Sequence, residues 1–268
     1  MHMAKILLRK SLYFLSYYID KLVNHRGRKI FILCYHSLGE DDWFYNVRPE
    51  DFKSQMNYLL THYNPISLSD LYNFLEGENT LDKDSFVVTF DDGYRDILSV
   101  KDFCSKNQIK PTVFVLSQPG KANRDELETP RQFLRNADIL KLYKAGWEIG
   151  SHGSTHNYFG TLDKNHLLSE IVQSKYHLEK ALKIPINFFA YPKGVYNTGI
   201  INIVKTAEYK LGLSMDNNVI KPGVNRFLLP RVGVNRSHSL QEFRSIFLST
   251  SAKMRNIITM IFGVVKYN

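Results

Sequence analysis

Apolar residues follow two alternating patterns along the chain from residue 30 onward. Short continuous apolar runs predict buried strands, and segments with an apolar residue every three or four positions predict amphipathic helices. Strands are expected at 30–35, 86–90, 112–116, 147–150, 188–191 and 211–214, with an extended segment at 228–234. Helices are expected at 49–63, from Ser69 onward, and at 136–145, 165–182, 198–205 and 240–248. This alternation predicts βαβ units, and hence an α/β fold with a mainly parallel sheet.

The residues best suited to chemistry follow the ends of these expected strands. Asp91 and Asp92 come directly after the second strand, and His152 comes after the fourth. Lys193 and Gly194 come after the fifth. In a (β/α) barrel the carboxyl ends of the strands lie on one rim, where catalytic residues gather. A barrel would therefore bring these residues together.

The adjacent carboxylates Asp91 and Asp92 are the first candidate for catalysis. Two neighbouring side chains at a strand end point in different directions, so one can bind a cation while the other acts as a base. The alternative is an acidic turn that caps the helix after it.

His152 and His156 are the second candidate, because histidines four residues apart are a common spacing for zinc ligands. Both rings can face one point if the loop makes a helical turn. The alternative is a pair of solvent-exposed loop histidines. With one of the carboxylates, they would make a three-ligand site for a divalent transition metal, with positions open to water and substrate. Such a site generates hydroxide near neutral pH, and the spare carboxylate would serve as the general base.

A third segment, Phe-Phe-Ala-Tyr-Pro-Lys-Gly at 188–194, suits a turn that approaches a ligand. Proline restricts the backbone there, and glycine permits a close approach. An exposed backbone N–H in this turn could stabilise a developing oxyanion.

These motifs, in this order, resemble those of the polysaccharide deacetylase (NodB-homology) family. They read TFDDGY at 89–94, SHGSTH at 151–156 and FAYPKG at 189–194. Two further segments also resemble the family, LKLYKAGWEIGSH at 140–152 and LPRVGV at 229–234. The resemblance implies a single catalytic domain at 30–250, a distorted (β/α) barrel with fewer than eight strands, and hydrolysis of N-acetyl groups on glycans. It is strongest to the poly-N-acetylglucosamine deacetylases.

The resemblance also implies roles for individual residues. Asp91 matches the catalytic base, and Arg231 matches the residue that orients it. The backbone N–H of Lys193 matches the oxyanion donor. The metal ligands of the family match Asp92, His152 and His156.

Three departures from the family pattern affect these assignments. Gly153 replaces the Ser or Thr that often follows the first metal histidine, and Ala190 replaces a frequent Arg. No Leu-x-x-His follows Arg231, where many members carry the catalytic acid. The poly-N-acetylglucosamine branch takes this histidine from an early strand, and His36 ends the first expected strand here. We therefore expect His36 to be the acid, with His238 as the weaker candidate.

The sequence leaves several alternatives open. An O-acetyl esterase could use the same site, and an inactive glycan-binding domain could share the fold. The sugar is not identified, and a polymer, a lipid-linked intermediate, a nucleotide sugar or a lipid A precursor would all fit. Imidazole and carboxylate ligands suit zinc, cobalt or nickel.

The charge of the chain, formally +9, is concentrated at its two ends. Residues 1–30 carry seven basic side chains against one acid, and residues 251–268 carry three against none. The intervening residues balance, which argues against a nucleic-acid partner. Basic, apolar ends at 1–29 and 251–268 suit an anionic membrane surface. With no cleavage site after the first apolar run, and no run of about 20 apolar residues, we expect a cytoplasmic protein on the inner face of a membrane. Residues 4–24 are expected to form an amphipathic helix.

The two cysteines, Cys34 and Cys104, each lie in an apolar run. We expect both to be reduced thiols in the core. They cannot form a disulfide framework or a zinc ribbon by themselves.

Overall fold

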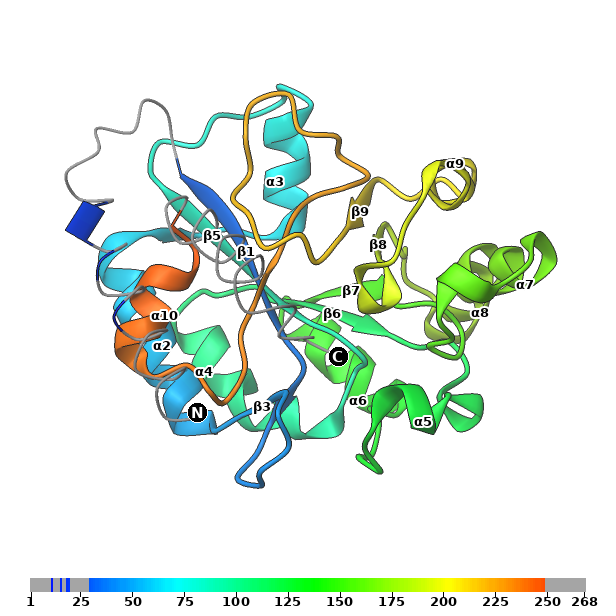
Figure 1. Ribbon diagram of the computed structural model, residues 1–268, viewed down its shortest axis with the longest axis horizontal. Helices are drawn as coiled ribbons and strands as arrows, with labels where there is room; N and C mark the ends of the chain where they lie inside the picture. Colours follow the sequence, from blue (N-terminus) through cyan, green and yellow to red (C-terminus); the bar gives the residue numbers. More distant parts are fainter. Residues whose placement is uncertain (1–10, 12–14, 16–17, 20–28, 249–268) are drawn as a thin grey trace.

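A parallel sheet curls into a distorted barrel at the centre of the molecule, and helices surround it (Figure 1). The computed structural model describes residues 11, 15, 18–19 and 29–248. The strand order is β10-β1-β5-β6-β7-β8-β9, with β4 paired to β5. These strands are β1 (Ile30–Tyr35), β4 (Asn64–Pro65), β5 (Ser85–Phe90), β6 (Thr112–Val115), β7 (Glu148–Ser151), β8 (Phe188–Ala190), β9 (Leu211–Leu213) and β10 (Val232–Gly233). A separate pair joins β2 (Ser37–Leu38) to β3 (Asn46–Val47).

The order of the strands around the sheet follows the chain from β5 to β9, and β10 then returns to pair with β1. The chain between β9 and β10 bridges the two edges. Leu213 in β9 pairs with Leu229, and the N–H of Ser214 donates to the Leu229 carbonyl at 2.9 Å. This path places Arg231 on the inside of the curled sheet.

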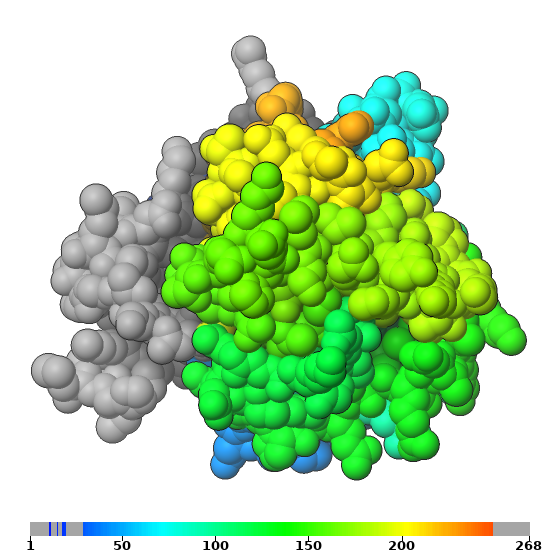
Figure 2. Space-filling view, turned by 90° about the vertical axis from the view of Figure 1, so that its right-hand side faces the viewer, coloured from blue at the N-terminus to red at the C-terminus, as the bar shows by residue number. Residues whose placement is uncertain are grey.

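Helices follow most of the strands, and most of them cover the outer face of the sheet. They are α2 (Pro49–His62), α3 (Leu68–Leu75), α4 (Lys101–Lys106), α5 (Arg124–Leu127), α6 (Asn136–Lys144), α7 (Lys164–Leu168), α8 (Ser174–Leu182), α9 (Thr198–Thr206) and α10 (Leu240–Ile246). A π-helical segment, η4 (Ser169–Gln173), connects α7 to α8, and a short 3₁₀ turn, η5 (Pro192–Gly194), follows β8. Figure 2 shows the face of the molecule formed by the green and yellow segments in the second half of the chain, α7 and α8 among them.

The strands are buried on both faces, as the continuous apolar runs predict for a parallel sheet. In β1, Phe31, Leu33 and Tyr35 pack in the larger core with the helices. Ile30 and Ile32 alternate with them and belong to the smaller core. Side chains alternate between the faces of a strand, so Cys34 shares the face of Ile30 and Ile32.

The sequence prediction of a mainly parallel α/β barrel is confirmed, and the seven expected extended segments each contain a strand. Three details were wrong. The helix expected from Ser69 begins at Leu68, where Ser67 and Asp70 form a capping box. The helix expected at 165–182 is interrupted by η4, and the extended segment at 228–234 contains only the two residues of β10. The short elements β2, β3, β4, α4 and α5 were not predicted.

Both cysteines are free and buried, as expected. Of the helix expected at 4–24, only residues 11, 15 and 18–19 are described, each as helical. The remaining residues of that helix and the C-terminal segment at 251–268 lie outside the described residues. Among the helices that the structure describes, none is long and apolar enough to cross a bilayer.

Candidate active site

The turn after β5 directs its two carboxylates to different partners. Asp92 and Gly93 both have left-handed backbone conformations, with φ of 66° and 71°. A Cβ on Gly93 would lie 2.9 Å from Val115 Cγ1, so both the conformation and the packing require glycine. Asp91 faces Arg231, and Asp92 faces the two histidines of the loop after β7.

Asp91 and Arg231 form a buried bidentate ion pair. Arg231 Nη1 donates to Asp91 Oδ1 and Nη2 donates to Oδ2, both at 2.6 Å. The same guanidinium donates to the Ser214 carbonyl at 3.1 Å and to Thr89 Oγ1 at 3.2 Å. The Cys34 thiol also donates to Asp91 Oδ2, at 3.3 Å. These contacts fix the orientation of the carboxylate.

This pairing keeps Asp91 ionised. Burial alone would raise the pKa of Asp91, but the charge of Arg231, then that of His152, and the hydrogen bonds from Arg231 outweigh it and hold the pKa well below its usual range. Burial would lower the pKa of Arg231, and the charge of Asp91 raises it instead. Asp91 is therefore a carboxylate at neutral pH.

The loop after β7 carries both candidate metal histidines. It does not make the helical turn that the sequence suggested. Gly153 (φ 85°) and His156 (φ 63°) have left-handed conformations instead, and the two imidazole centroids lie 5.2 Å apart. His152 Nδ1 lies 2.9 Å from the Ala190 carbonyl. A carbonyl only accepts, so Nδ1 carries the proton and Nε2 presents its lone pair to the pocket.

Asp92, His152 and His156 converge on one point. Asp92 Oδ1 lies 3.4 Å from His152 Nε2 and 3.5 Å from His156 Nε2. That oxygen is buried and accepts no hydrogen bond. Zinc bonds to nitrogen and oxygen are about 2.0–2.2 Å long, and tetrahedral donors are then about 3.3–3.5 Å apart. The spacing and the unpaired buried oxygen both fit a shared divalent ion.

The titration of the two histidines also suits metal binding. Burial lowers the pKa of His152 to about 4, although Asp91 and Asp92 oppose it. Burial, with a smaller effect of the His36 charge, lowers the pKa of His156 to about 4. Metal ligation requires neutral imidazole, so a cation does not have to displace a proton from either ring near neutral pH.

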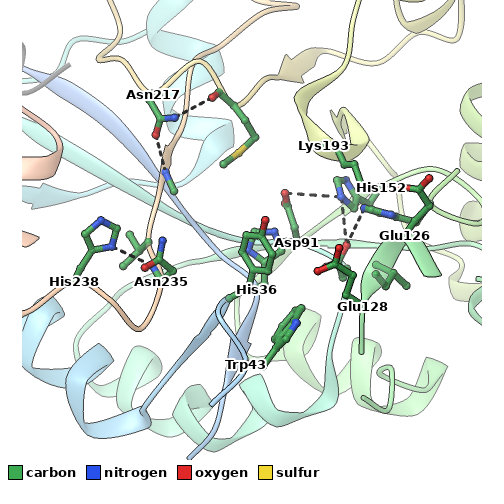
Figure 3. A pocket seen from close by; sticks show the side chains of 17 residues that line it. His36, Trp43, Asp91, Glu126, Glu128, His152, Lys193, Asn217, Asn235 and His238 are labelled. Carbon is green, nitrogen blue, oxygen red and sulfur yellow. Dashed lines mark hydrogen bonds and ion pairs between the residues drawn. The ribbon is translucent and has the colours of Figure 1, made fainter. Parts of the chain in front are cut away.

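His36 and His238 both line the pocket around these groups. A ring nitrogen of His36 lies within 4.8 Å of the Asp91 carboxylate, and its Nδ1 is buried without a hydrogen bond. His238 Nδ1 accepts the backbone N–H of Asn235 at 3.2 Å. Figure 3 shows His36 beside Asp91, and His238 beside Asn235 farther from His152. Of the two histidines, His36 is therefore the one that lies next to the Asp91 carboxylate.

Lys193, in η5, also lines the pocket. Its backbone is left-handed (φ 53°), and its ammonium forms an ion pair with Glu126 of α5. Gly194 (φ 68°) was expected to permit approach to a ligand. Packing also requires a glycine at this position, because a Cβ there would lie 2.8 Å from Met215 Cβ.

The pocket contains residues that the sequence motifs did not identify. The loop between β2 and β3 contributes Trp43 and Tyr45, and α5 and its C-cap contribute Glu126 and Glu128. Burial, with a smaller effect of the Glu128 charge, raises the pKa of Tyr45 to about 12, so its hydroxyl stays protonated. The aromatic triplet at 43–45 was a signal in the sequence, whereas α5 offered none.

Backbone strain is concentrated at this pocket. Left-handed conformations of residues other than glycine cost about 1–3 kcal/mol and gather at functional sites. Of the eight such residues in the described part of the chain, five line the pocket: Asp92, Glu128, His156, Lys193 and Asn217.

The fold and this site together define a hydrolase with a divalent-metal centre. A family model described as "Polysaccharide deacetylase" matches residues 78–212, and the chain belongs to that family. It is a metal-dependent hydrolase of the class that removes N-acetyl groups from saccharides. The matched stretch includes Asp91, Asp92, His152, His156 and Lys193, whereas His36 and Arg231 lie outside it.

Curated relatives and solved structures extend the likeness beyond residues 78–212. A poly-beta-1,6-N-acetyl-D-glucosamine N-deacetylase of Staphylococcus aureus is 24% identical over 226 residues, covering 78% of this chain and 76% of the relative. The deacetylase PplD of Streptococcus pyogenes, solved with acetate, has a TM-score of 0.71 at 22% identity, covering 82% of this chain and 99% of PplD. IcaB of Ammonifex degensii also has a TM-score of 0.71, at 20% identity, covering 85% of this chain and 98% of IcaB. The two structures support the fold.

Proposed function

We propose that this protein hydrolyses the N-acetyl groups of a polymer of N-acetylglucosamine and releases acetate. The observation that carries the proposal is the convergence of Asp92, His152 and His156 beside a separately held carboxylate, Asp91. The staphylococcal relatives, which are named for a β-1,6-linked polymer, support a substrate of that kind.

Asp92, His152 and His156 would hold the metal ion. Their mixed carboxylate and imidazole donors suit zinc, with cobalt and nickel as alternatives. When bound, the ion supplies a Lewis acid that polarises the acetamido carbonyl and lowers the pKa of water. The hydrogen bond between His152 and the Ala190 carbonyl orients its ring for that role.

Asp91 acts as the general base. A carboxylate offers about four acceptor sites. Two of these sites accept hydrogen bonds from Arg231, and a third accepts a hydrogen bond from the Cys34 thiol. One site remains for the proton of the attacking water. Arg231 keeps Asp91 charged and in place, so the carboxylate does not need to rotate before it accepts the proton of the attacking water.

Two further groups would assist when the carbon–nitrogen bond breaks. The backbone N–H of Lys193, which belongs to a left-handed turn that lines the pocket, would donate to the developing oxyanion. His36 then protonates the departing amine, because an amine leaves poorly without a proton.

The pocket has a volume of about 230 Å³. Typical small-molecule sites begin at about 300 Å³, so this cavity suits a single sugar unit with its neighbours outside. Trp43 and Tyr45 form one wall, where the C–H face of a sugar ring can pack on an aromatic ring.

Replacing His36 with alanine is expected to slow hydrolysis of an N-acetyl sugar by about 10²–10⁴, the usual contribution of a general acid. An activated ester, whose leaving group needs no proton, should be affected much less. Initial rates with both substrates check this, and His238→Ala is the matched control. Equal losses on amide and ester in the His36 variant would contradict the assignment.

Acetate release from matched N-acetyl and O-acetyl saccharides tests the proposed reaction against its alternatives. We expect the zinc-loaded protein to release acetate from the N-acetyl substrate. Release from the O-acetyl substrate alone would indicate an esterase instead. Saccharide binding with no release from either substrate would indicate an inactive binding domain.

We also propose that the protein is cytoplasmic and attaches reversibly to the inner face of a membrane through its basic ends. The support comes from the sequence, because most of residues 1–29 and all of residues 251–268 lie outside the described residues. Each basic residue near an anionic surface contributes about 1 kcal/mol. Leu7 to Val23 and Ile257 to Val265 each combine apolar residues with basic neighbours.

Vesicle co-sedimentation tests this attachment. The full chain is expected to sediment with anionic vesicles but not with neutral ones, and high salt should release it. Deletion of residues 1–28 should weaken the binding. Equal behaviour with anionic and neutral vesicles would mean that the charged ends do not attach the protein.

A further inference from the structure

Glu170 is a buried carboxylate behind the loop that carries the metal histidines. It lies in η4, and its exposed fraction is 4%. A charged side chain is rarely buried unless hydrogen bonds or opposite charges compensate for the lost water. The partners of Glu170 therefore indicate what its burial serves.

All three hydrogen bonds to Glu170 come from two consecutive residues of that loop. Its Oε2 accepts the N–H of Ser154 at 2.7 Å and the N–H of Thr155 at 3.0 Å. Its Oε1 accepts the hydroxyl of Thr155. Ser154 and Thr155 stand between His152 and His156, so Glu170 holds the segment that sets the separation of the two imidazoles.

The other side of the loop is held by its carbonyl groups. The carbonyls of Gly153, Ser154 and Thr155 accept backbone N–H groups at 3.1, 3.0 and 2.8 Å, from Ser117, Gln118 and Asn123 in that order. The loop is therefore fixed from both sides, by backbone donors on one side and by one carboxylate on the other. Without Glu170, the amide groups of Ser154 and Thr155 would lose their acceptor.

The π-helical geometry of η4 adds a second contact to this loop. A π-helical segment widens the helix by one residue and changes which backbone groups are paired, and such segments are frequent at functional sites. Here the Ser169 carbonyl accepts the Ser154 hydroxyl at 3.0 Å. The interruption of the helix predicted at 165–182 thus coincides with the residues that hold the metal loop.

Gly153 leaves room for the carboxylate of Glu170. A Cβ at Gly153 would lie 2.9 Å from Glu170 Oε2, and its φ of 85° disfavours any other residue. The absence of a side chain here leaves the space that the Glu170 carboxylate occupies.

We propose that Glu170 is a positioning residue of the metal centre, which fixes the 152–156 loop so that His156 faces Asp92. His156 has a left-handed backbone (φ 63°), a conformation that persists only when its surroundings enforce it. Glu170 supplies that constraint through Ser154 and Thr155. The inference rests on the proposed metal site, and it concerns how tightly this chain binds the ion.

The test compares zinc affinity, by competition with a chromogenic chelator, and the thermal midpoint of the metal-free protein. Glu170→Ala is expected to weaken zinc binding by about 10–100-fold, the usual effect of losing a group that orients ligands. Glu170→Gln should recover most of the affinity, because its amide oxygen can accept both N–H groups. Gln173→Ala is the matched control, an exposed residue of the same π-helical segment, and should bind zinc as the wild type does.

Unchanged zinc affinity in Glu170→Ala, with only the thermal midpoint lowered, would overturn the proposal and leave Glu170 a purely structural role. If the alanine variant does not fold, Glu170→Asp decides, because its shorter carboxylate cannot reach both amides. Wild-type affinity in the aspartate variant would equally overturn the proposal. Failure of the wild-type protein to bind zinc would instead contradict the metal site itself.

Discussion

Replacing His152 with alanine is expected to remove the bound metal and abolish deacetylation. The imidazole supplies one of three protein ligands, and its Nε2 lies 3.4 Å from the ligand oxygen of Asp92. The two remaining donors would hold a divalent ion much more weakly. Loss of the Lewis acid removes several kcal/mol of transition-state stabilisation, and each 1.4 kcal/mol is about a factor of ten in rate. A rate loss of at least about 10³ follows.

Metal content by atomic emission and acetate release by coupled assay check both parts of this expectation. His166→Ala is the matched control, because His166 is solvent-exposed and its imidazole pairs with Asp163, outside the pocket. The control should keep the metal and full activity. A His152 variant that retains one ion per chain would contradict the ligand assignment.

Replacing Asp91 with asparagine should leave the metal bound, unlike the His152 substitution, but should also reduce the rate of deacetylation strongly. The amide cannot accept a proton from water, so turnover is expected to fall by about 10²–10⁴, the usual contribution of a general base. The metal should remain, because Asp92, His152 and His156 are unchanged. Turnover and metal content of the purified variant provide the check.

The same substitution should lower stability. Arg231 is fully buried, and Asp91 is its carboxylate partner. Breaking a buried ion pair by removing one partner costs about 3–5 kcal/mol, because the remaining charge is uncompensated. Urea unfolding of the metal-free protein measures this cost. Asp125→Asn, at an exposed aspartate of α5, is the control and should leave both stability and turnover unchanged.

Metal content separates the roles of the two adjacent aspartates. If Asp91→Asn loses the metal while Asp92→Asn retains it, the assignments of base and ligand are reversed. The structure argues for the present assignment. Asp91 is engaged by Arg231 and Cys34, whereas Asp92 Oδ1 has no hydrogen bond and faces two imidazoles.

The strands and the motif residues could be predicted because their signals are local. The six consecutive apolar residues of β1, and the mostly apolar residues of β5, are buried on both faces of a parallel sheet. Residues that follow such strands lie together once the sheet curls, which brings Asp91, Asp92 and His152 to one pocket. The two-residue strands β2 and β3 have no periodicity to detect.

Contacts that depend on tertiary packing could not be predicted from the sequence. Cys34 belongs to an apolar run and was expected only to fill the core, yet its thiol reaches Asp91, 57 residues away. Glu170 lies within the helix expected at 165–182, and the sequence analysis did not single it out. Its inward direction depends on η4 and on the space left by Gly153, and neither has a local sequence signal.

Mass spectrometry of a β-1,6-linked N-acetylglucosamine oligomer, incubated with the zinc-loaded protein, tests the central claim most directly. The account predicts stepwise loss of acetyl groups, with an equal amount of free acetate, and no loss with the His152→Ala variant. An oligomer left intact by the folded, zinc-loaded wild-type protein would contradict deacetylation of this polymer.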